Sequence, residues 1–349
     1  MSIYKDVENL REELEKDQKD KVKVALFGQP GAGKSSLINK IIGENKAQTG
    51  QSTDVTVEAL EYEHEDLVLV DLPGYGTSKF PKDRWEQEFQ PEQYDLFLCV
   101  FSGKFHSADT ELFKQLKDRG KVCLFVRNKH DDIWEDGKTL EQLEAEIVAD
   151  VQKQVGSREA VHFVSCRRGT GLDQLSESIQ HALEPSRREK YIRSAKAYTL
   201  KHLEAKKESA KRLIYKYAGL AAANGLNPVP GVDISVDLGV MLVLFNKLRD
   251  SYGLSENKIN NLTPTLLPIG KKVLDIATKE GILLLLKRFA GQQASKQISK
   301  YIPFVGQAIA ATIGFALTKY AGEAYLNDCH ELAMKILEEE LALKGATVN

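Results

Sequence analysis

The chain has 349 residues, which is too long for one ordinary domain, so two domains are expected. Apolar residues make up 42% of it, enough to bury sizeable cores, and no low-complexity stretch indicates disorder. The 48 basic residues nearly balance the 50 acidic ones, so the charge gives no indication of a nucleic-acid-binding protein.

The cysteines and the first residues indicate the compartment. The four cysteines lie far apart with no CxxC pair, which is typical of reduced core thiols and argues against a disulfide framework or a zinc site. Residues 1–6 have no apolar signal core, and Ser2 stands where N-myristoylation would require glycine. We therefore expect a cytoplasmic protein.

Residues 3–20 carry apolar side chains at helical spacing among many charges, which predicts a short surface helix that packs on another element. Strands and helices then alternate through residues 21–184. Strands are expected at 22–27, 55–62, 67–70, 96–101, 122–127 and 161–164, and helices at 34–42, 108–119, 140–154 and 172–183. Because the runs 67–70 and 122–126 are apolar on both faces, we expect an α/β domain with a mostly parallel six-stranded sheet, which binds its ligands at the carboxyl ends of the strands.

Between the first strand and its helix, residues 28–35 match the phosphate-binding pattern G-x-x-x-x-G-K-[ST] without departure. Glycines in such a loop turn successive backbone N–H groups toward one anion, and the helix start adds the positive end of its dipole. Lys34 would reach the β- and γ-phosphates, and Ser35 would bind Mg²⁺. The residues expected around the phosphates are Gly28, Gln29, Pro30, Gly31, Ala32, Gly33, Lys34, Ser35 and Ser36.

Two further segments are expected near the γ-phosphate. Residues 48–56 should form the first switch loop, in which a threonine senses the γ-phosphate and completes the Mg²⁺ shell; Thr53 and Thr56 both qualify, and spacing does not separate them. The strand 67–70 is followed by a D-x-x-G sequence. Asp71 can hold Mg²⁺ through water, and Gly74 can turn its N–H toward the γ-phosphate.

An N-K-x-D sequence follows the strand 122–127 and predicts selection of guanine. The Asp131 carboxylate can accept both the N1–H and the exocyclic amine of guanine, whereas adenine offers no such pair of donors. The base end of the site is expected to contain Asn128, Lys129 and Asp131, with Ser165, Cys166 and Arg167 closing over the base through backbone groups. Because the motifs occur in the right order, each at a predicted strand end, they predict a guanine-nucleotide-binding domain.

Tyr75, directly after Gly74, departs from the Ras-like pattern, which places there a glutamine that positions the attacking water. Tyrosine cannot do this in the same way. Either hydrolysis is slow or another group, for example from a second molecule, positions the water. The other interpretation is that Tyr75 only packs beneath the switch. The sequence leaves both open.

Residues 185–349 show no strand pattern, so an all-helical domain is expected there. Residues 186–217 contain eleven Lys and Arg against three Glu on what is predicted to be one long helix. This stripe is either a contact for anionic lipid or, as the sequence favours, a solvated helix face.

Residues 301–318 form an uncharged run that is almost long enough to span a bilayer. The run contains proline, glycine and many alanines, which favours a helix that other helices approach closely over membrane insertion or docking. A last, amphipathic helix is expected at residues 323–343.

Taken together, the whole chain resembles an immunity-related GTPase of the interferon-inducible family, which is dynamin-like in its assembly; bacterial relatives with a similar helical half are equally compatible. The nucleotide motifs are shared by many GTPases, so the segments after residue 185 make the resemblance specific. The matching segments are residues 28–39, 55–58 with Tyr62, 71–76, 80–81, 94–95, 125–127, 228–231, 252–254 and 302–306.

The resemblance implies a GTPase domain (residues 21–184) and a helical domain built from both ends of the chain (1–20 and 185–349). It also implies GTP-dependent dimerisation across the GTPase domains, co-operative hydrolysis and action at membranes. Lys34 places the chain with the members that keep lysine in the phosphate loop. In the family an acid two residues before the switch threonine assists hydrolysis in trans, and here Asp54 precedes Thr56 in that way.

We therefore expect a GTPase that uses Mg²⁺ to form GDP and phosphate and that forms a homodimer or larger homo-oligomer with GTP, with possible peripheral contact with a membrane surface and no nucleic-acid partner. Catalysis would be electrostatic and positional. The residues assigned to it are Lys34, Thr53, Asp54, Thr56 and Gly74. The alternative is a non-assembling switch with negligible turnover that binds a partner protein. A ribosome-assembly GTPase is disfavoured, because no GXXG clamp or basic RNA-binding module follows.

Overall fold

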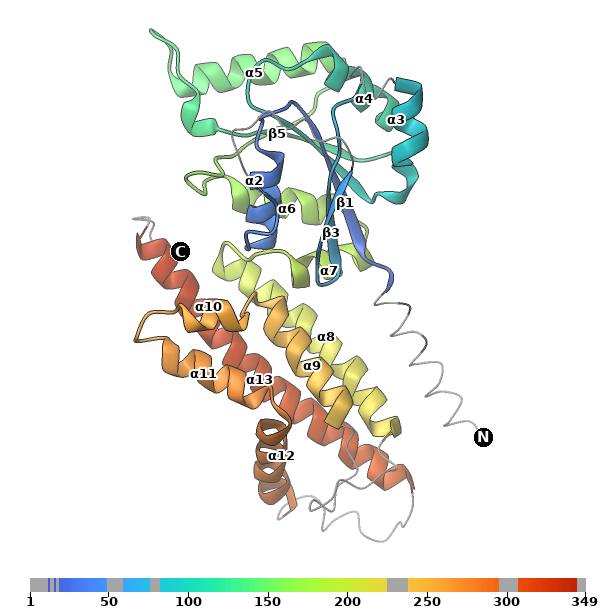
Figure 1. The fold of residues 1–349 in the computed structure, drawn as a ribbon, viewed down its shortest axis with the longest axis vertical. Helices are drawn as coiled ribbons and strands as arrows, with labels where there is room; N and C mark the ends of the chain where they lie inside the picture. Colours follow the sequence, from blue (N-terminus) through green and yellow to red (C-terminus); the bar gives the residue numbers. More distant parts are fainter. Residues whose placement is uncertain are drawn as a thin grey trace. The chain divides into compact units, whose positions relative to one another are not determined.

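The computed structural model of the chain describes residues 19–48, 59–75, 82–224, 238–294 and 307–343, together with Glu12 and Lys16. By its internal contacts the chain forms two compact units, one of residues Lys21–Lys196 and the other from Ala197 onward, which also includes the residues up to Asp20. The two units are drawn in Figure 1. The helix expected over residues 3–20 lies almost entirely outside the described residues.

A six-stranded sheet forms the centre of the first unit, in the order β2-β3-β1-β4-β5-β6. The strands are β1 (Val22–Gly28), β2 (Leu60–His64), β3 (Leu67–Asp71), β4 (Leu96–Phe101), β5 (Cys123–Arg127) and β6 (Val161–Phe163). All neighbouring pairs are parallel except β2 and β3. The mostly parallel six-stranded sheet expected from the sequence is confirmed.

The edge strand β2 was expected at residues 55–62 but runs from Leu60, opposite Asp71, to His64, opposite Leu67. Residues 55–58 lie outside the described residues. The strand continues two residues further than expected because one face of an edge strand can carry charges, so its polar residues do not mark its end. Glu65 makes the tight turn into β3 with a φ of 53°.

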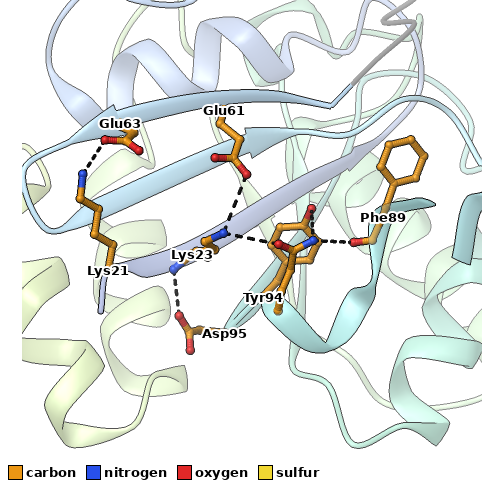
Figure 2. A network of polar contacts seen from close by, with 8 residues as sticks. Lys21, Lys23, Glu61, Glu63, Phe89, Tyr94 and Asp95 are labelled. Carbon is orange, nitrogen blue, oxygen red and sulfur yellow. Dashed lines mark hydrogen bonds and ion pairs between the residues drawn. The ribbon is translucent and has the colours of Figure 1, made fainter. Parts of the chain in front are cut away.

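The charges on β2 are paired with lysines at the start of β1, as Figure 2 shows. Lys21 Nζ lies 2.5 Å from Glu63 Oε2, and Lys23 Nζ lies 3.8 Å from Glu61 Oε1. The Lys23 N–H also donates to Asp95 Oδ2 over 2.8 Å, just before β4. These contacts connect β2, β1 and the start of β4. They lie at the amino ends of the parallel strands, opposite to the carboxyl ends where such sheets bind ligands.

Helices cover both faces of the sheet, because its central strands are buried on both faces. They are α2 (Lys34–Ile42), α3 (Lys82–Phe89), α4 (Ser107–Asp118), α5 (Leu140–Val155), α6 (Leu172–Ala182) and α7 (Pro185–Ser194). One face packs on α3, α4 and α5 through a cluster that includes Phe97, Phe125 and Trp85. From the other face α2 and α7 contact β1 and β3, and α6 packs beside α2 (Figure 1). Helix α3 was not expected from the sequence.

The single long helix expected over residues 186–217 is wrong, because the chain forms α7 and then α8 (Leu200–Asn224). Helix α7 ends at Ala195, whose ψ is 151°. The next residue, Lys196, donates its N–H to the Ile41 carbonyl at the end of α2. Arg193 Nη2 lies 2.9 Å from Asp66 Oδ2 in the turn after β2. These contacts attach α7 to the sheet, so the first unit ends at Lys196 and not at residue 184.

The described part of the second unit is helical. Besides α8 it contains α9 (Leu238–Ser251), α10 (Glu256–Asn260), α11 (Leu267–Ile276), α12 (Lys279–Ala294) and α13 (Gln307–Leu343). The long helices α8 and α13 pack side by side (Figure 1), and a Cβ on Gly322 would lie 3.0 Å from Ile214. Phe245 of α9 stacks on Tyr325 of α13 with ring centroids 4.4 Å apart.

The run 301–318 and the helix expected at 323–343 are not separate helices, because α13 continues through both. Residues 301–306 lie outside the described residues. Leu317, Thr318 and Ala321 are buried, so this part of α13 packs inside the unit as the sequence favoured. Among the helices that the structure describes, none is long and apolar enough to cross a bilayer.

The basic residues at 186–217 do not share one exposed face. Lys190, Arg193 and Lys206 are buried, and the Lys206 ammonium donates to the Ser251 carbonyl at the end of α9 over 2.7 Å. Three others are exposed on α8: Lys201, Arg212 and Lys216. The four cysteines are free and buried, as expected: Cys99, Cys123, Cys166 and Cys329.

Candidate nucleotide-binding site

The phosphate loop lies at the carboxyl end of β1 and leads into α2 at Lys34. Two of its glycines leave no room for a side chain. A Cβ on Gly28, whose φ is 127°, would lie 2.1 Å from the Val100 carbonyl oxygen. A Cβ on Gly33, whose φ is 90°, would lie 2.4 Å from Asn128 Nδ2. The loop can therefore keep this conformation only with glycine at both positions.

Lys34, Ser35 and Asp71 form a buried polar cluster where α2 begins beside the end of β3. The Lys34 ammonium donates to the Gly28 carbonyl over 3.3 Å and lies 3.7 Å from Asp71 Oδ1. The Ser35 hydroxyl donates to Asp71 Oδ2 over 3.2 Å. Burial raises the pKa of the Asp71 carboxyl, and the charge of Lys34 and the hydrogen bond from Ser35 oppose that rise. The structure thus brings together three residues to which the sequence assigned phosphate and metal binding.

One oxygen of Asp71 fits a metal-bound water. Oδ1 is buried, and within the described part of the chain it has no hydrogen-bond partner. The nearby Ser35 hydroxyl is an oxygen ligand of the kind that Mg²⁺ takes, and Mg²⁺ keeps several of its waters. The donor set therefore fits Mg²⁺ bound by Ser35 directly and by Asp71 through water. The other expected metal ligands, Thr53 and Thr56, lie outside the described residues, as does Asp54.

The remaining residues of the loop differ in what their side chains do. Gln29 Nε2 donates to the Lys104 carbonyl over 2.5 Å, so this amide holds the loop to the segment after β4. Pro30 is exposed and Ser36 is half-buried in the first turn of α2. Gly74, also half-buried, follows β3. Ser36 and Gly74 were expected to contact phosphate through their backbone N–H groups, whereas Pro30 has no N–H to donate.

Asn128 connects the phosphate loop to the base end of the site. Its Nδ2 donates to the Ala32 carbonyl over 2.8 Å, and its Oδ1 accepts from the Cys166 N–H over 3.2 Å. The side chain is buried. Asn128 therefore joins the loops that follow β1, β5 and β6.

Asp131 lies in the same loop as Asn128 and contacts the loop after β6. The Ser165 hydroxyl donates to Asp131 Oδ1 over 2.5 Å and lowers the pKa of the carboxyl, an effect to which Arg167 adds. Burial raises the pKa of the Cys166 thiol to about 11, so this residue is a neutral thiol. Lys129 is exposed in a left-handed conformation with a φ of 56°. Asp131 is thus a charged acceptor at the position expected for recognition of guanine.

A model of the family described as Interferon-inducible GTPase (IIGP) matches residues 2–339 of the chain. The chain belongs to this family. The chain is 22% identical over 351 residues to Interferon-gamma-inducible GTPase 10 of Mus musculus, and the aligned region covers 94% of the chain and 84% of that relative. It is 25% identical over 370 residues to Interferon-inducible GTPase 5 of Rattus norvegicus, and the aligned region covers 95% of the chain and 79% of that relative.

A bacterial protein, GTPase Der of Buchnera aphidicola subsp. Schizaphis graminum, is 26% identical over 242 residues, which cover 63% of the chain and 51% of that protein. The resemblance found in the sequence is confirmed by the family model. As a member of a GTPase family, the chain binds GTP and hydrolyses it.

Tyr75 of this interferon-inducible GTPase packs inside the first unit. The side chain is buried, its ring meets Trp85 edge to face at 5.6 Å, and its hydroxyl donates to Gln115 Oε1 over 2.8 Å. Trp85 in turn donates from Nε1 to the Pro73 carbonyl over 3.1 Å. Tyr75 therefore packs beside the segment after β3.

Two features of the site could not be found in the sequence. Asp109 in the first turn of α4 is buried, and among the described residues its Oδ2 has no hydrogen-bond partner. Burial raises the pKa of this carboxyl to about 6, and the nearby charges of His106 and Lys34 oppose the rise. An acid in the first turn of a helix is an ordinary sequence feature, so only the fold shows that it is buried near Lys34. The second feature is the Arg167 side chain, which pairs with Asp131.

Proposed function

We propose that this family member hydrolyses GTP to GDP and phosphate at the cluster of Lys34, Ser35 and Asp71, with Mg²⁺ as the cofactor. The observation that carries the proposal is the connection of this cluster, through Asn128, to the loop that holds Asp131. One continuous site then contains a positive charge and backbone N–H groups for phosphates, an acid for the metal and an acid for guanine.

The residues of the chain would act by position and charge. The Lys34 ammonium would contact the β- and γ-phosphates, and the N–H of Gly74 would face the γ-phosphate. Asp131 would accept the two N–H groups of guanine, with Asn128 and Lys129 shaping the base end. Mg²⁺, when bound, supplies positive charge to the phosphate oxygens.

We further propose that the protein dimerises or oligomerises in the GTP state and that this completes catalysis. Because Tyr75 is packed on Trp85, it is not placed as the glutamine of Ras-like GTPases is, and another group has to position the attacking water. In the family resemblance that group is an acid before the switch threonine, which here is Asp54, acting on the nucleotide of a second copy.

GTP turnover per molecule, measured over an about hundredfold range of protein concentration, tests this. Specific activity is expected to rise with concentration in the presence of Mg²⁺. Lys34→Ala serves as the blank, since it removes the charge that contacts the phosphates. Asp54→Ala is also measured in a mixture with an excess of Lys34→Ala. If Asp54 acts in trans, the Lys34→Ala copy supplies the acid, and the mixture hydrolyses more GTP than Asp54→Ala alone.

A flat and low specific activity, with GTP still bound, would contradict self-association. It would support the alternative of a non-assembling switch that binds a partner protein. In that case the packed Tyr75 marks a site that depends on an external activator.

The exposed basic residues of α8 support a second proposal, which is that the GTP-bound form contacts anionic lipid. Lys201, Arg212 and Lys216 are exposed on this helix, and each basic residue near an anionic surface adds about 1 kcal/mol. Sedimentation with phosphatidylserine-containing vesicles is expected to exceed that with phosphatidylcholine alone and to weaken with salt. Equal sedimentation with both kinds of vesicle would contradict the proposal.

A further inference from the structure

Two arginines follow Ser165 and Cys166 in the loop after β6, and both lie beside Asp131. Arg167 Nη2 forms an ion pair with Asp131 Oδ2 and donates to Asp132 Oδ1 over 3.0 Å. Arg168 Nε lies 3.9 Å from the same oxygen of Asp131. The Asp131 side chain is only 5% exposed, whereas that of Arg167 is 68% exposed. The carboxylate is therefore covered, and the arginine that covers it faces solvent.

The two oxygens of Asp131 face different groups of the loop after β6, and among the described residues Oδ2 has an ion-pair partner but no hydrogen-bond donor. Oδ1 accepts the Ser165 hydroxyl over 2.5 Å, and Oδ2 faces the guanidinium of Arg167. The Ser165 contact is neutral and holds the loop, whose Arg168 N–H donates back to the Ser165 hydroxyl oxygen over 3.0 Å. The Arg167 contact joins two opposite charges, and it occupies the oxygen that a second donor would need.

The guanidinium of Arg167 and the edge of guanine present the same chemistry to a carboxylate. In guanine, N1–H and the exocyclic amine are attached to one carbon and lie in one plane. In arginine, two of the guanidinium nitrogens are arranged in the same way. A carboxylate accepts such a planar pair of N–H donors through both of its oxygens. Arg167 places one nitrogen of this kind, Nη2, against Asp131 Oδ2, which is one of the two oxygens that the guanine edge would use.

We propose that Arg167 is a built-in competitor of guanine for Asp131, which must leave the carboxylate when GTP or GDP binds. This inference rests on the proposed selection of guanine by Asp131. Arg167 sets how tightly, and for how long, a guanine nucleotide is held. When the base begins to leave, the guanidinium takes the carboxylate back and speeds release.

The surroundings of Arg167 allow this exchange. Its side chain is mostly exposed, so it can turn into solvent without disturbing a core. Asp132, 53% exposed, already accepts a hydrogen bond from Arg167 Nη2. The guanidinium can therefore keep one charged partner while it releases the other, which lowers the cost of opening.

The test is the binding of a fluorescent GDP analogue to the full chain, with dissociation followed by stopped flow. Arg167→Gln is expected to bind GDP about three- to tenfold more tightly and to release it correspondingly more slowly, the range expected for loss of a competing half-exposed ion pair. The matched control is Arg168→Gln, which removes the same charge from a side chain that is also 68% exposed but whose Nε lies 3.9 Å from Asp131 Oδ2, further away than Arg167 Nη2. It should leave the affinity within about twofold of the original.

A second variant distinguishes failure of the inference from failure of the proposed function. Asp131→Asn should weaken GDP binding and favour xanthosine diphosphate, whose base carries a carbonyl where guanine has the amine. In that background Arg167→Gln should no longer tighten binding, because the carboxylate is gone. If Asp131→Asn leaves GDP binding unchanged, the guanine selection by Asp131 fails, and the inference fails with it.

If Asp131→Asn behaves as expected but Arg167→Gln does not tighten GDP binding in the original chain, the competition is refuted while guanine selection stands. Weaker GDP binding in Arg167→Gln than in Arg168→Gln would show that Arg167 contacts the nucleotide, which also overturns the inference. The same tightening in both arginine variants would reduce the effect to net charge and refute a specific competitor.

Discussion

The phosphate end and the base end of the candidate site are built in different ways. At the phosphate end, Lys34 and Asp71 are buried, and glycines hold the loop against neighbouring backbone and side-chain atoms. At the base end, charged side chains surround Asp131, and Arg167 and Asp132 are 68% and 53% exposed. The first is set by packing, whereas the second depends on ion pairs in contact with solvent.

Under the proposed function, this difference would let one site combine strong binding of the phosphates with exchange of the nucleotide. Groups fixed by packing lose little entropy when the phosphates bind, so they contribute affinity. Surface ion pairs are worth little individually and rearrange readily, so they can regulate release. Variants that act on one end, or on the link between the ends, test whether this division holds.

The largest expected effect comes from Gly33→Ala, because this residue lies where the two ends meet. The added Cβ would lie 2.4 Å from Asn128 Nδ2, at a backbone φ of 90°. The loop and Asn128 cannot both keep their positions, so we expect the affinity for GDP to fall about a thousandfold. Equilibrium binding of a fluorescent GDP analogue measures the loss.

The matched control for this prediction is Gly31→Ala. Gly31 also has a positive φ, 73°, but a Cβ there would have nothing within 4 Å. The control therefore carries backbone strain without a clash, and a loss of about tenfold is expected. Equal losses in the two variants would mean that strain alone limits the loop and that the contact with Asn128 does not.

The second prediction concerns only the phosphate end. Asp71→Asn keeps the size of the side chain and an acceptor for Ser35, but it removes the negative charge that would hold Mg²⁺ through water. We expect GTP turnover to fall roughly a hundredfold, measured as phosphate release.

Removal of the metal provides the control for Asp71→Asn. In the original chain, EDTA should speed the release of GDP, because the metal links the protein to the phosphates. In the variant EDTA should have little effect on release. If EDTA acts equally on both proteins, Asp71 does not hold the metal.

The smallest expected effect tests the buried charge near the phosphate end. Burial raises the pKa of Asp109 to about 6 in the folded chain, from an ordinary value of 3.8. Its protonated form therefore stabilises the fold below about pH 4, and this contribution is lost as the pH rises to about 6. Asp109→Asn should consequently raise the free energy of unfolding by about 2 kcal/mol at pH 7.5 and by almost nothing at pH 4.

Tryptophan fluorescence during urea unfolding measures this effect in the relevant unit. The two tryptophans of the chain, Trp85 and Trp134, both belong to the unit Lys21–Lys196. The control is Asp118→Asn, which changes an exposed acid at the other end of α4. A gain for Asp109→Asn that is the same at both pH values would show that burial of the charge is not its cause.

The local parts of the site and fold could be predicted from the sequence. Helix α2 has the predicted bounds, Lys34–Ile42, because its start is set by the glycine loop and its length by apolar spacing along one segment. The mostly parallel pairing of the sheet follows from strands that are apolar on both faces and from the helices between them. Patterns of this kind depend on neighbours in the chain, which a sequence displays directly.

Features that depend on distant residues could not be predicted. The end of α7 is set by a hydrogen bond from Lys196 to Ile41, and no breaker marks it in the sequence. Helix α3 has few apolar residues besides Trp85 and Phe89, so its pattern is too weak to indicate a helix without the core on which it packs. The pairing of Arg167 with Asp131 likewise depends on two loops that only the sheet brings together.

The network of Figure 2 has a consequence for aggregation. A sheet that ends in exposed strands can add a strand from another molecule, unless its edges are short or charged. Here β6 is only three residues long, and β2 carries Glu61 and Glu63, which are paired with Lys23 of β1 and with Lys21 just before it. Both edges are thus poor templates for another chain. Activity that rises with protein concentration would therefore reflect an interface elsewhere on the molecule and not the pairing of edge strands from two molecules.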